Sequence, residues 1–476
     1  MGFALLNKRS AADTLDAMGA TLLSLVKPLP RPDRALAAGV GAVLVGVLVG
    51  RALAVDVPLG VALLLGVCYA PLVFLNLPLA VVLWIPLVFL EAVPSFNLGA
   101  KAAGLLLAIG WAGLLYTGGD VSTAVLRRHR RLVEALVCLL VWVTLSLAWA
   151  LDLDRAMGHI WQWWAVAVVF LIVATCIRSD AILRLAVGAF VAGAVLTILA
   201  GLALGNVGAG EATTRFTGGA GDPNFLASGL VPSIVLAGGL AGASKAAGLR
   251  WTMLAVIAFL ALGVVMSESR GAAVASVVTV AAALIFFKHR RVYVIALAMV
   301  AVGFAVLAFA VVPGSWERVS NVGESGARGD IWTIAWRVGE DHALVGVGAK
   351  SFQEAAADYV QEPGTLTHVG IIAEDTKAVH NLYLELFAEI GIVGLSLFLI
   401  VVAGCLQAAW LATRRFEALG RPDLETVARS ILVANIAMLS TAIFLSSQVD
   451  KRLWILLALG PAALEVSRRV SPRVPG

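Results

Sequence analysis

Long runs of apolar residues restrict the fold of this chain more than any other feature of its sequence. Residues 181–204, AILRLAVGAFVAGAVLTILAGLAL, are typical and contain one charged side chain. A helix needs about 20 such residues to cross a bilayer. Hydrophobic residues make up 60% of the 476 residues and charged residues only 14%, whereas soluble domains are about half apolar and a quarter charged. We therefore predict an all-α polytopic membrane protein whose surroundings are the lipid bilayer, with no nucleic-acid partner.

Fourteen segments are long and apolar enough to be candidate membrane spans. They are residues 35–55, 57–75, 77–93, 98–116, 132–150, 159–177, 181–204, 224–242, 251–267, 271–287, 292–312, 381–404, 429–447 and 452–466. Neighbouring runs almost touch at Asn76 and at 267–270, where either pair can instead form a broken or re-entrant helix. We expect a bundle of 12–14 transmembrane helices, divided between residues 35–312 and 381–466.

Clusters of basic residues predict the orientation of the bundle. They precede the first span and then follow at every second connection, as RRHRR (127–131), RSDAILR (178–184), SKAAGLR (244–250), KHRR (288–291), RR (414–415) and SRRVSPR (467–473). Loops rich in Lys and Arg stay on the cytoplasmic side. Both the N-terminal segment 1–34 and the tail 467–476 are therefore expected in the cytoplasm. We interpret the clusters as determinants of topology in preference to partner-binding sites.

The same alternation places four segments outside: 151–158, 205–223, 267–270 and the long loop 313–380. The long loop holds ten acidic residues against five Lys and Arg, and it is too long to be a simple connection. Within it, DIWTIAWRVGEDH has apolar residues at helical spacing, and ALVGVGAKSF is typical of a glycine-rich turn. We predict one large external loop that forms a small helical cap.

Two arginines interrupt the apolar pattern before this loop. Arg270 stands between two apolar runs, where a charged side chain usually faces a cavity or a partner. Its alternative role is to pair with Glu268. Arg215 lies in a loop rich in glycine, which can bring backbone N–H groups close to an anion. The alternative there is an ordinary turn before a helix, with Asp222 or Asn224 as the cap.

Two further candidates lie in the long loop. Arg328 either contributes to a site or only caps a helix or pairs with Asp330. His380 starts a long apolar helix, and its alternative role is that of an interfacial histidine that donates to a carbonyl. Arginine side chains bind phosphate oxygens in bidentate fashion, and histidine is a suitable general base at neutral pH. Together these residues suit a substrate with a diphosphate leaving group and an acceptor hydroxyl.

The order of these motifs resembles the O-antigen ligase and O-antigen polymerase superfamily. TRFTG and DPNFLA are followed by SESRGA, then ARGDIWTIAW and HALVGVGAKSF, then HNLYLELFAEIGIVGL. One specific part is Arg-x-x-x-Trp with a Gly-x-Gly turn, at Arg328, Trp332, Gly346 and Gly348. The other is His-Asn with a Gly-x-x-Gly helix, at His380, Asn381, Gly391 and Gly394. The resemblance covers about residues 130–465, and family members commonly have about twelve spans.

The resemblance implies a metal-independent, inverting glycosyltransferase with a GT-C-like bundle in the bacterial inner membrane, with its active site on the external face. Such an enzyme takes a glycan from undecaprenyl diphosphate and passes it to a saccharide or glycolipid acceptor, as ligase or as polymerase, without a cofactor. His380 corresponds to the general base. Arg270, Arg328 and, less closely, Arg215 correspond to the diphosphate ligands. We expect the substrate pocket to include Asn381, Asn224 and Trp332.

Three other functions are compatible with parts of the pattern. The carboxylates of Asp152 and Asp154 are spaced as in sites that hold a metal and a phosphate. A transporter or flippase of lipid-linked saccharides would line its path with arginines, but here the polar residues gather on one face. A peptidoglycan-type polymerase would be expected to use a decisive acidic residue in the external loop, where Glu374 and Asp375 are not distinctive.

Overall fold

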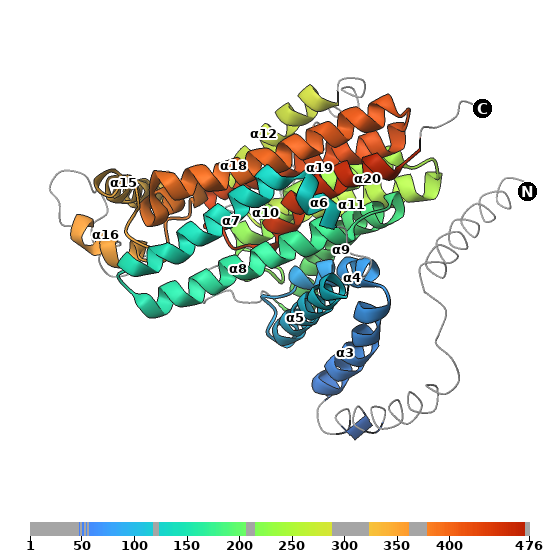
Figure 1. The fold of residues 1–476 in the computed structure, drawn as a ribbon, viewed down its shortest axis with the longest axis horizontal. Helices are drawn as coiled ribbons and strands as arrows, with labels where there is room; N and C mark the ends of the chain where they lie inside the picture. Colours follow the sequence, from blue (N-terminus) through green and yellow to red (C-terminus); the bar gives the residue numbers. More distant parts are fainter. Residues whose placement is uncertain are drawn as a thin grey trace, which may run out of the picture.

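The computed structural model describes residues 57–117, 123–205, 215–287, 323–360 and 378–471, with isolated positions between 47 and 54. Every regular element in these ranges is a helix, and most of the long helices run roughly side by side in one bundle (Figure 1). The prediction of an all-α polytopic membrane protein is confirmed. Eight of the described helices are long and apolar enough to cross a membrane.

The helices fall into two groups along the chain. The group before residue 288 comprises α3 (Val57–Leu75), α4 (Leu77–Val88), α5 (Pro94–Tyr116), α6 (Thr123–Arg128), α7 (Arg130–Leu145), η2 (Ser146–Trp149), α8 (Leu153–Cys176), α9 (Asp180–Leu204), α10 (Pro223–Ala243), α11 (Ala247–Met266) and α12 (Arg270–Phe286). The second group comprises α15 (Gly323–Asp341), α16 (Phe352–Val360), α18 (Leu382–Ala418), α19 (Pro422–Thr441), η4 (Ala442–Phe444) and α20 (Lys451–Arg469).

The expected spans overlap these helices wherever the two can be compared, although the bounds differ, as at 77–93, where α4 ends at Val88. The candidate span 292–312, and 35–55 apart from its isolated positions, lie outside the described residues. Each of the other twelve overlaps a helix. The expected external segment 151–158 is shorter than predicted, because Asp152 caps α8 and the helix already begins at Leu153.

Both ambiguous junctions are breaks between helices. Asn76 alone separates α3 from α4, and its side chain accepts a hydrogen bond from the Leu79 amide. A proline in the first turn of α4 prevents the preceding helix from continuing. Since α4 has 12 residues, it is about 18 Å long and is shorter than the apolar layer of a bilayer.

Aromatic side chains fill the centre of the bundle. Trp163 of α8 and Phe398 of α18 both pack edge-on against Trp454 of α20, with ring centroids 6.0 and 6.4 Å from it. Helix α20 is buried along nearly its whole length between α18, α8 and α19. In contrast, only 17% of the residues in the 18-residue apolar stretch of α5, and likewise of α11, are buried. This difference indicates that α20 is a core helix, whereas α5 and α11 present apolar side chains to lipid.

Ion pairs bring several basic clusters together at one end of the bundle, which we call the basic end. Arg128 lies 2.6 Å from Glu465 near the end of α20, and Arg184 pairs with Asp423 at the start of α19 at 2.5 Å. Arg421 approaches Asp180 at 3.4 Å. The positive-inside pattern predicts this gathering of basic loops, and the cytoplasmic location of this end stays a prediction.

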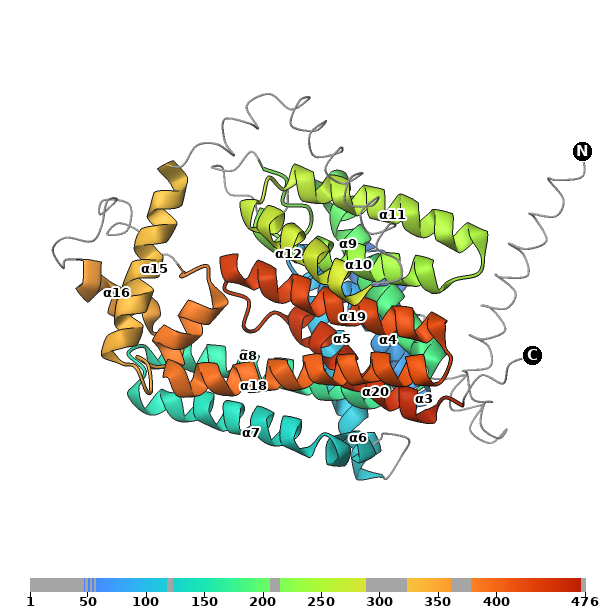
Figure 2. The same cartoon turned by 90° about the horizontal axis from the view of Figure 1, so that it is seen from above.

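The opposite end carries the described part of the long loop, and we call it the α15 end (Figure 2). The Ala349 amide donates to Ser146 Oγ at 3.1 Å, and the Leu151 amide donates to Ser351 Oγ at 3.0 Å. The predicted helical pattern is confirmed as α15, which buries Ile331, Ile334, Ala335 and Val338. Residues 361–377 of the predicted cap, with Glu374 and Asp375, lie outside the described residues.

Candidate functional site

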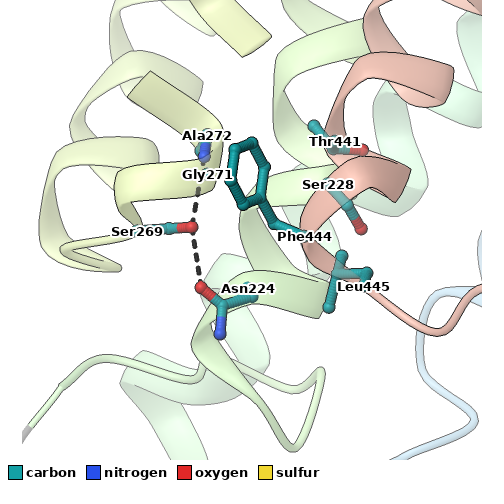
Figure 3. Close-up of a pocket in the computed structure, with 8 residues that line it drawn as sticks. All are labelled: Asn224, Ser228, Ser269, Gly271, Ala272, Thr441, Phe444 and Leu445. Atoms are coloured by element: carbon teal, nitrogen blue, oxygen red, sulfur yellow. Dashed lines mark hydrogen bonds between the residues drawn. The ribbon is translucent and has the colours of Figure 1, made fainter. Parts of the chain in front are cut away.

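A small pocket at the α15 end lies between the starts of α10 and α12 and the chain that follows α19. Figure 3 shows the Phe444 ring between these segments and the Ser269 hydroxyl pointing at Asn224. Ser269 Oγ donates to Asn224 Oδ1 at 2.8 Å and accepts from the Ala272 amide at 3.3 Å. The lining residues are Asn224, Ser228, Ser269, Gly271, Ala272, Thr441, Phe444 and Leu445.

The helix caps explain why Asn224 is available to this pocket. Asp222 Oδ1 accepts from the amides of Asn224 and Phe225 at 2.7 and 3.0 Å. The sequence alternatives named Asp222 or Asn224 as the cap of this helix, and it is Asp222. Because Asp222 satisfies the first amides of α10, the Asn224 side chain can extend sideways to Ser269.

The start of α12 has the properties of an anion-binding helix end. Its cap is the neutral Ser269, its first residue is Arg270, and no acidic residue lies in its first turn. The N-terminus of a helix carries a partial positive charge that favours anions. Gly271 permits close packing here, because a Cβ atom on it would lie 2.7 Å from Phe444 Cβ.

Arg215 links the glycine-rich loop to this helix start. Its Nε and Nη2 atoms donate to the Ser267 carbonyl at 3.0 and 2.8 Å, and Nη2 also lies 3.4 Å from Asn224 Oδ1. The Phe216 amide donates to the Met266 carbonyl at 3.3 Å. One edge of the guanidinium group is therefore engaged with the turn that leads to Arg270. Next to Ser267, Glu268 has a φ of 48°.

His380 directly precedes Asn381, the cap residue of α18, and has a φ of 51°. Its backbone N–H donates to Ser446 Oγ at 3.2 Å. Asn381 is the cap of α18, since its Oδ1 accepts from the Tyr383 and Leu384 amides at 3.0 and 3.1 Å. This capping role explains the asparagine without a substrate, and a place for Asn381 in a substrate pocket stays a prediction.

Trp332 of the long loop contacts both the segment before His380 and the pocket residue Phe444. Its indole N–H donates to the Val379 carbonyl at 3.0 Å, and its ring centroid lies 6.1 Å from that of Phe444. Arg328 lies one turn earlier in the same helix, and its side chain is outside the described part of the chain. The alternative that Arg328 caps a helix is wrong, because α15 begins at Gly323.

The sequence analysis missed the polar segment after η4 and the carboxylates near it. Ser446 Oγ donates to Glu385 Oε2, and Gln448 Nε2 donates to Glu385 Oε1 at 2.9 Å. Glu385 is 1% exposed and Glu389 is 3% exposed. Two glutamates four residues apart in an apolar helix were a visible signal, since acidic residues in such helices usually have a functional or paired role.

Lys350 faces these carboxylates from the glycine-rich turn. Its Nζ lies 3.5 Å from Glu385 Oε1. Burial alone would lower the pKa of Lys350, but the negative charges of Glu385, Glu389 and Glu354 outweigh burial and raise its pKa above the usual value. Lys350 is therefore a cation at neutral pH, and it balances part of the buried negative charge.

A buried ion pair supports the floor of the pocket. Arg452 is 2.7 Å from Asp450, and its Nη1 donates to the Phe225 carbonyl at 2.8 Å. Nη2 lies 3.4 Å from Ser228 Oγ, which lines the pocket. These contacts join α20 to α10 beside the pocket.

The two carboxylates considered for a metal site both lie at the N-terminus of α8. Asp152 Oδ1 accepts from the Arg155 amide at 3.0 Å, and Oδ2 lies 3.3 Å from the Arg155 guanidinium. Asp154 lies in the first turn of α8. Among the residues that the structure describes, no three His, Cys, Asp or Glu side chains are grouped as metal ligands.

Residues 254–399 match the family model described as O-antigen ligase. The matched stretch contains all of α12, α15 and α16 and the start of α18, which includes His380 and Arg270. The resemblance to the O-antigen ligase and polymerase superfamily is confirmed over this stretch. The chain has no significant match among curated proteins.

Proposed function

We propose that this protein is an inverting membrane glycosyltransferase that moves a glycan from undecaprenyl diphosphate to an acceptor hydroxyl at the α15 end. The O-antigen ligase match supports glycosyl transfer in general. The finer features are our inference from the residues around Phe444. We further propose that this end faces the outside of the bacterial inner membrane, since the basic loops gather at the other end.

The observation that supports the proposal most is that Phe444 contacts both halves of the candidate site. On one side it packs against Gly271, the residue after Arg270. On the other side its ring lies 6.1 Å from that of Trp332, whose indole bonds to the residue before His380. Phe444 therefore connects an arginine-bearing helix start, through Trp332, with the segment that leads to His380.

The Arg270 side of the site suits a diphosphate. Arg270 adds a full positive charge to the partial charge of the α12 N-terminus, and a guanidinium group can bind two phosphate oxygens at once. Arg215 orients the turn that leads to Arg270 through the Ser267 carbonyl. We assign Arg328 to the same group of ligands from the family pattern. These positive charges would stabilise the departing diphosphate without a metal ion.

The His380 side suits activation of the acceptor. In the proposed step, the acceptor oxygen attacks the anomeric carbon from the face opposite the diphosphate. The new C–O bond forms as the bond to the diphosphate breaks, and the proton of the acceptor hydroxyl passes to His380. A general base typically contributes 10²–10⁴-fold to such a rate.

Transfer in detergent distinguishes this enzyme from a transporter. The purified protein should convert a radiolabelled undecaprenyl-diphosphate oligosaccharide and an acceptor into a new glycoside, with release of undecaprenyl diphosphate. A flippase forms no new bond and only moves the labelled donor between two compartments of a vesicle. Absence of a new glycoside, together with donor movement across vesicles, would contradict the proposal.

The acceptor used in the assay distinguishes a ligase from a polymerase. A ligase should label lipid A–core and leave the donor glycan at its original length. A polymerase should extend one lipid-linked repeat with another and give a ladder of products. Excess EDTA in either assay should leave the rate unchanged, since arginines take the role of a metal; loss of transfer that added Mg²⁺ or Mn²⁺ restores would contradict the metal-independent mechanism.

A further inference from the structure

A buried carboxylate joins three separate segments beneath His380. Glu385 is 1% exposed and lies in the first turn of α18. Its Oε2 accepts from Ser446 Oγ, which belongs to the segment after η4. Its Oε1 accepts from Gln448 Nε2 at 2.9 Å and lies 3.5 Å from Lys350 Nζ in the glycine-rich turn. Both oxygens of Glu385 are therefore engaged within the protein.

Ser446 connects this carboxylate with the candidate base. Its hydroxyl donates to Glu385, and the same oxygen accepts from the backbone N–H of His380 at 3.2 Å. A serine hydroxyl has one hydrogen and two lone pairs, so both contacts are satisfied together. Glu385 orients the Ser446 hydroxyl by accepting its hydrogen. The lone pairs of the Ser446 oxygen are then available to accept from the His380 amide.

Backbone strain indicates that this network has a purpose beyond packing. His380 and Lys350 both have left-handed backbones, with φ of 51° and 56°. Such a conformation costs a residue other than glycine about 1–3 kcal/mol and persists only where neighbouring contacts enforce it. Both strained residues connect to Glu385, directly for Lys350 and through Ser446 for His380. For stability alone, apolar packing would serve as well as a buried charge.

We propose that Glu385 and Ser446 are positioning residues for His380, which hold its backbone in the strained conformation required for general-base catalysis. This inference rests on the proposed role of His380. Neither residue touches the substrate in this account, and both act on the rate through the orientation of His380. Loss of the Ser446 hydroxyl removes this hydrogen bond from the His380 amide, so the backbone at 380 can relax.

Substitutions at Ser446 and Glu385 test the proposal through the kinetics of transfer. Ser446→Ala and Glu385→Gln should lower kcat about 10- to 100-fold, the loss that a misplacement of about 1 Å can produce. KM for the donor should stay within about twofold, because the diphosphate ligands are untouched. Ser446→Thr keeps the hydroxyl and should restore most of kcat. Ser440→Ala is the matched control, since among the residues described Ser440 Oγ donates within α19, to the Ile436 carbonyl at 2.8 Å.

A double-mutant cycle separates positioning from a general structural effect. In a His380→Ala background, Ser446→Ala should cost nothing further, because residues that act as a unit are not additive. An equal loss in both backgrounds would overturn the proposal. So would a Ser446→Ala variant that keeps more than half of the wild-type kcat.

Hydrogen exchange provides a measurement that needs no activity. The amides of a peptide that covers residues 378–386 should exchange faster in Ser446→Ala than in the wild type, and Ser446→Thr should match the wild type. Unchanged exchange in Ser446→Ala would overturn the proposed contact. If the wild type transfers no glycan while exchange responds as expected, the proposed function fails and the assigned link between Ser446 and His380 still stands.

Discussion

Three residues other than glycine have a positive φ in the described part of the chain: Glu268, Lys350 and His380. All three lie at the α15 end. Glu268 is two residues before Arg270, the Lys350 side chain contacts Glu385, and His380 precedes the cap of α18. Strained backbones of this kind concentrate at functional sites, because folding alone gives no reason to keep them. The strain therefore provides evidence for the site that is independent of the family match.

The role of Arg270 can be tested by a change that keeps its charge. If Arg270 binds a diphosphate with two nitrogen atoms, Arg270→Lys should lose at least about tenfold in kcat/KM, because lysine offers a single charged point. If Arg270 instead only balances Glu268, Arg270→Lys should be nearly silent. In that case Glu268→Gln should impair the protein as much as loss of Arg270.

This comparison requires steady-state rates at matched expression and matched melting temperature. Arg250→Lys at the opposite end of α11 is a suitable control, since its Nε bonds to the Ser244 carbonyl at 2.7 Å and it is exposed. Equal activity of the Arg270→Lys and Arg250→Lys variants would contradict diphosphate binding by Arg270.

Part of the site could be predicted from residue types alone. Arg215, Arg270 and His380 were visible because charged or titratable side chains interrupt apolar runs at the same predicted face. Phe444 could not be predicted, since a phenylalanine at the end of an apolar run looks like any lipid-facing residue. Its contact with Gly271 depends on how α19 packs against α12, which no local pattern encodes. Ser446 was missed for the same reason.

Helix α18 has a kink that the sequence motif Gly-x-x-Gly only partly indicates. Gly391 has φ 67° and ψ −174°, a backbone conformation that essentially only glycine adopts. The kink leaves backbone groups without helical partners, and Trp142 Nε1 donates to the Ile390 carbonyl at 2.9 Å. The Ile392 amide donates to the Ala343 carbonyl at 2.8 Å. The kink therefore joins α18 to the glycine-rich turn.

Gly391→Ala should destabilise the protein by more than the roughly 1–3 kcal/mol of the backbone strain. A Cβ atom at this position would also lie 2.2 Å from the Leu344 carbonyl oxygen. Gly158→Ala in α8 is the control, because no atom of the described residues lies within 4 Å of its Cβ position and alanine is favoured over glycine in helices. Thermal unfolding in detergent should show a lower Tm for Gly391→Ala alone, and equal Tm values would contradict this account of the kink.

The helices were more predictable than their ends. Apolar runs gave the existence of each described span, because burial in lipid requires continuous apolar residues. The run 381–404 understated α18, which continues to Ala418. Beyond residue 404 the helix carries Gln407, Arg414 and Arg415, and such polar residues are compatible with a helix that leaves the membrane but not with a hydropathy-based span.

At the scale of the whole molecule, the account depends on which end of the bundle faces outward. The clusters that contain Arg128 and Arg184 lie at the basic end, while the candidate site lies at the α15 end. We expect the α15 end outside the cell. Cysteine labelling tests this in a variant that lacks the four native cysteines, of which Cys68 and Cys138 are exposed.

Two exposed positions at opposite ends serve for this labelling. Asp358→Cys on α16 should react with a membrane-impermeant maleimide in whole cells, and Ala418→Cys at the end of α18 should react only after the cells are opened. The reverse pattern would remove the external site, because every proposed role assumes that face. Labelling of both variants after lysis is the control for accessibility.

The measurement that tests the central claim most directly is single-turnover transfer by variants of His380. His380→Ala removes the base. His380→Asn also removes the base, but asparagine tolerates a positive φ. A loss of rate in both variants is therefore not an effect of backbone strain. We expect both to lose at least about 100-fold in rate, while each binds the undecaprenyl-diphosphate donor as tightly as the wild type. Retention of more than about a tenth of the wild-type rate by either variant would contradict the account and leave His380 with a structural role only.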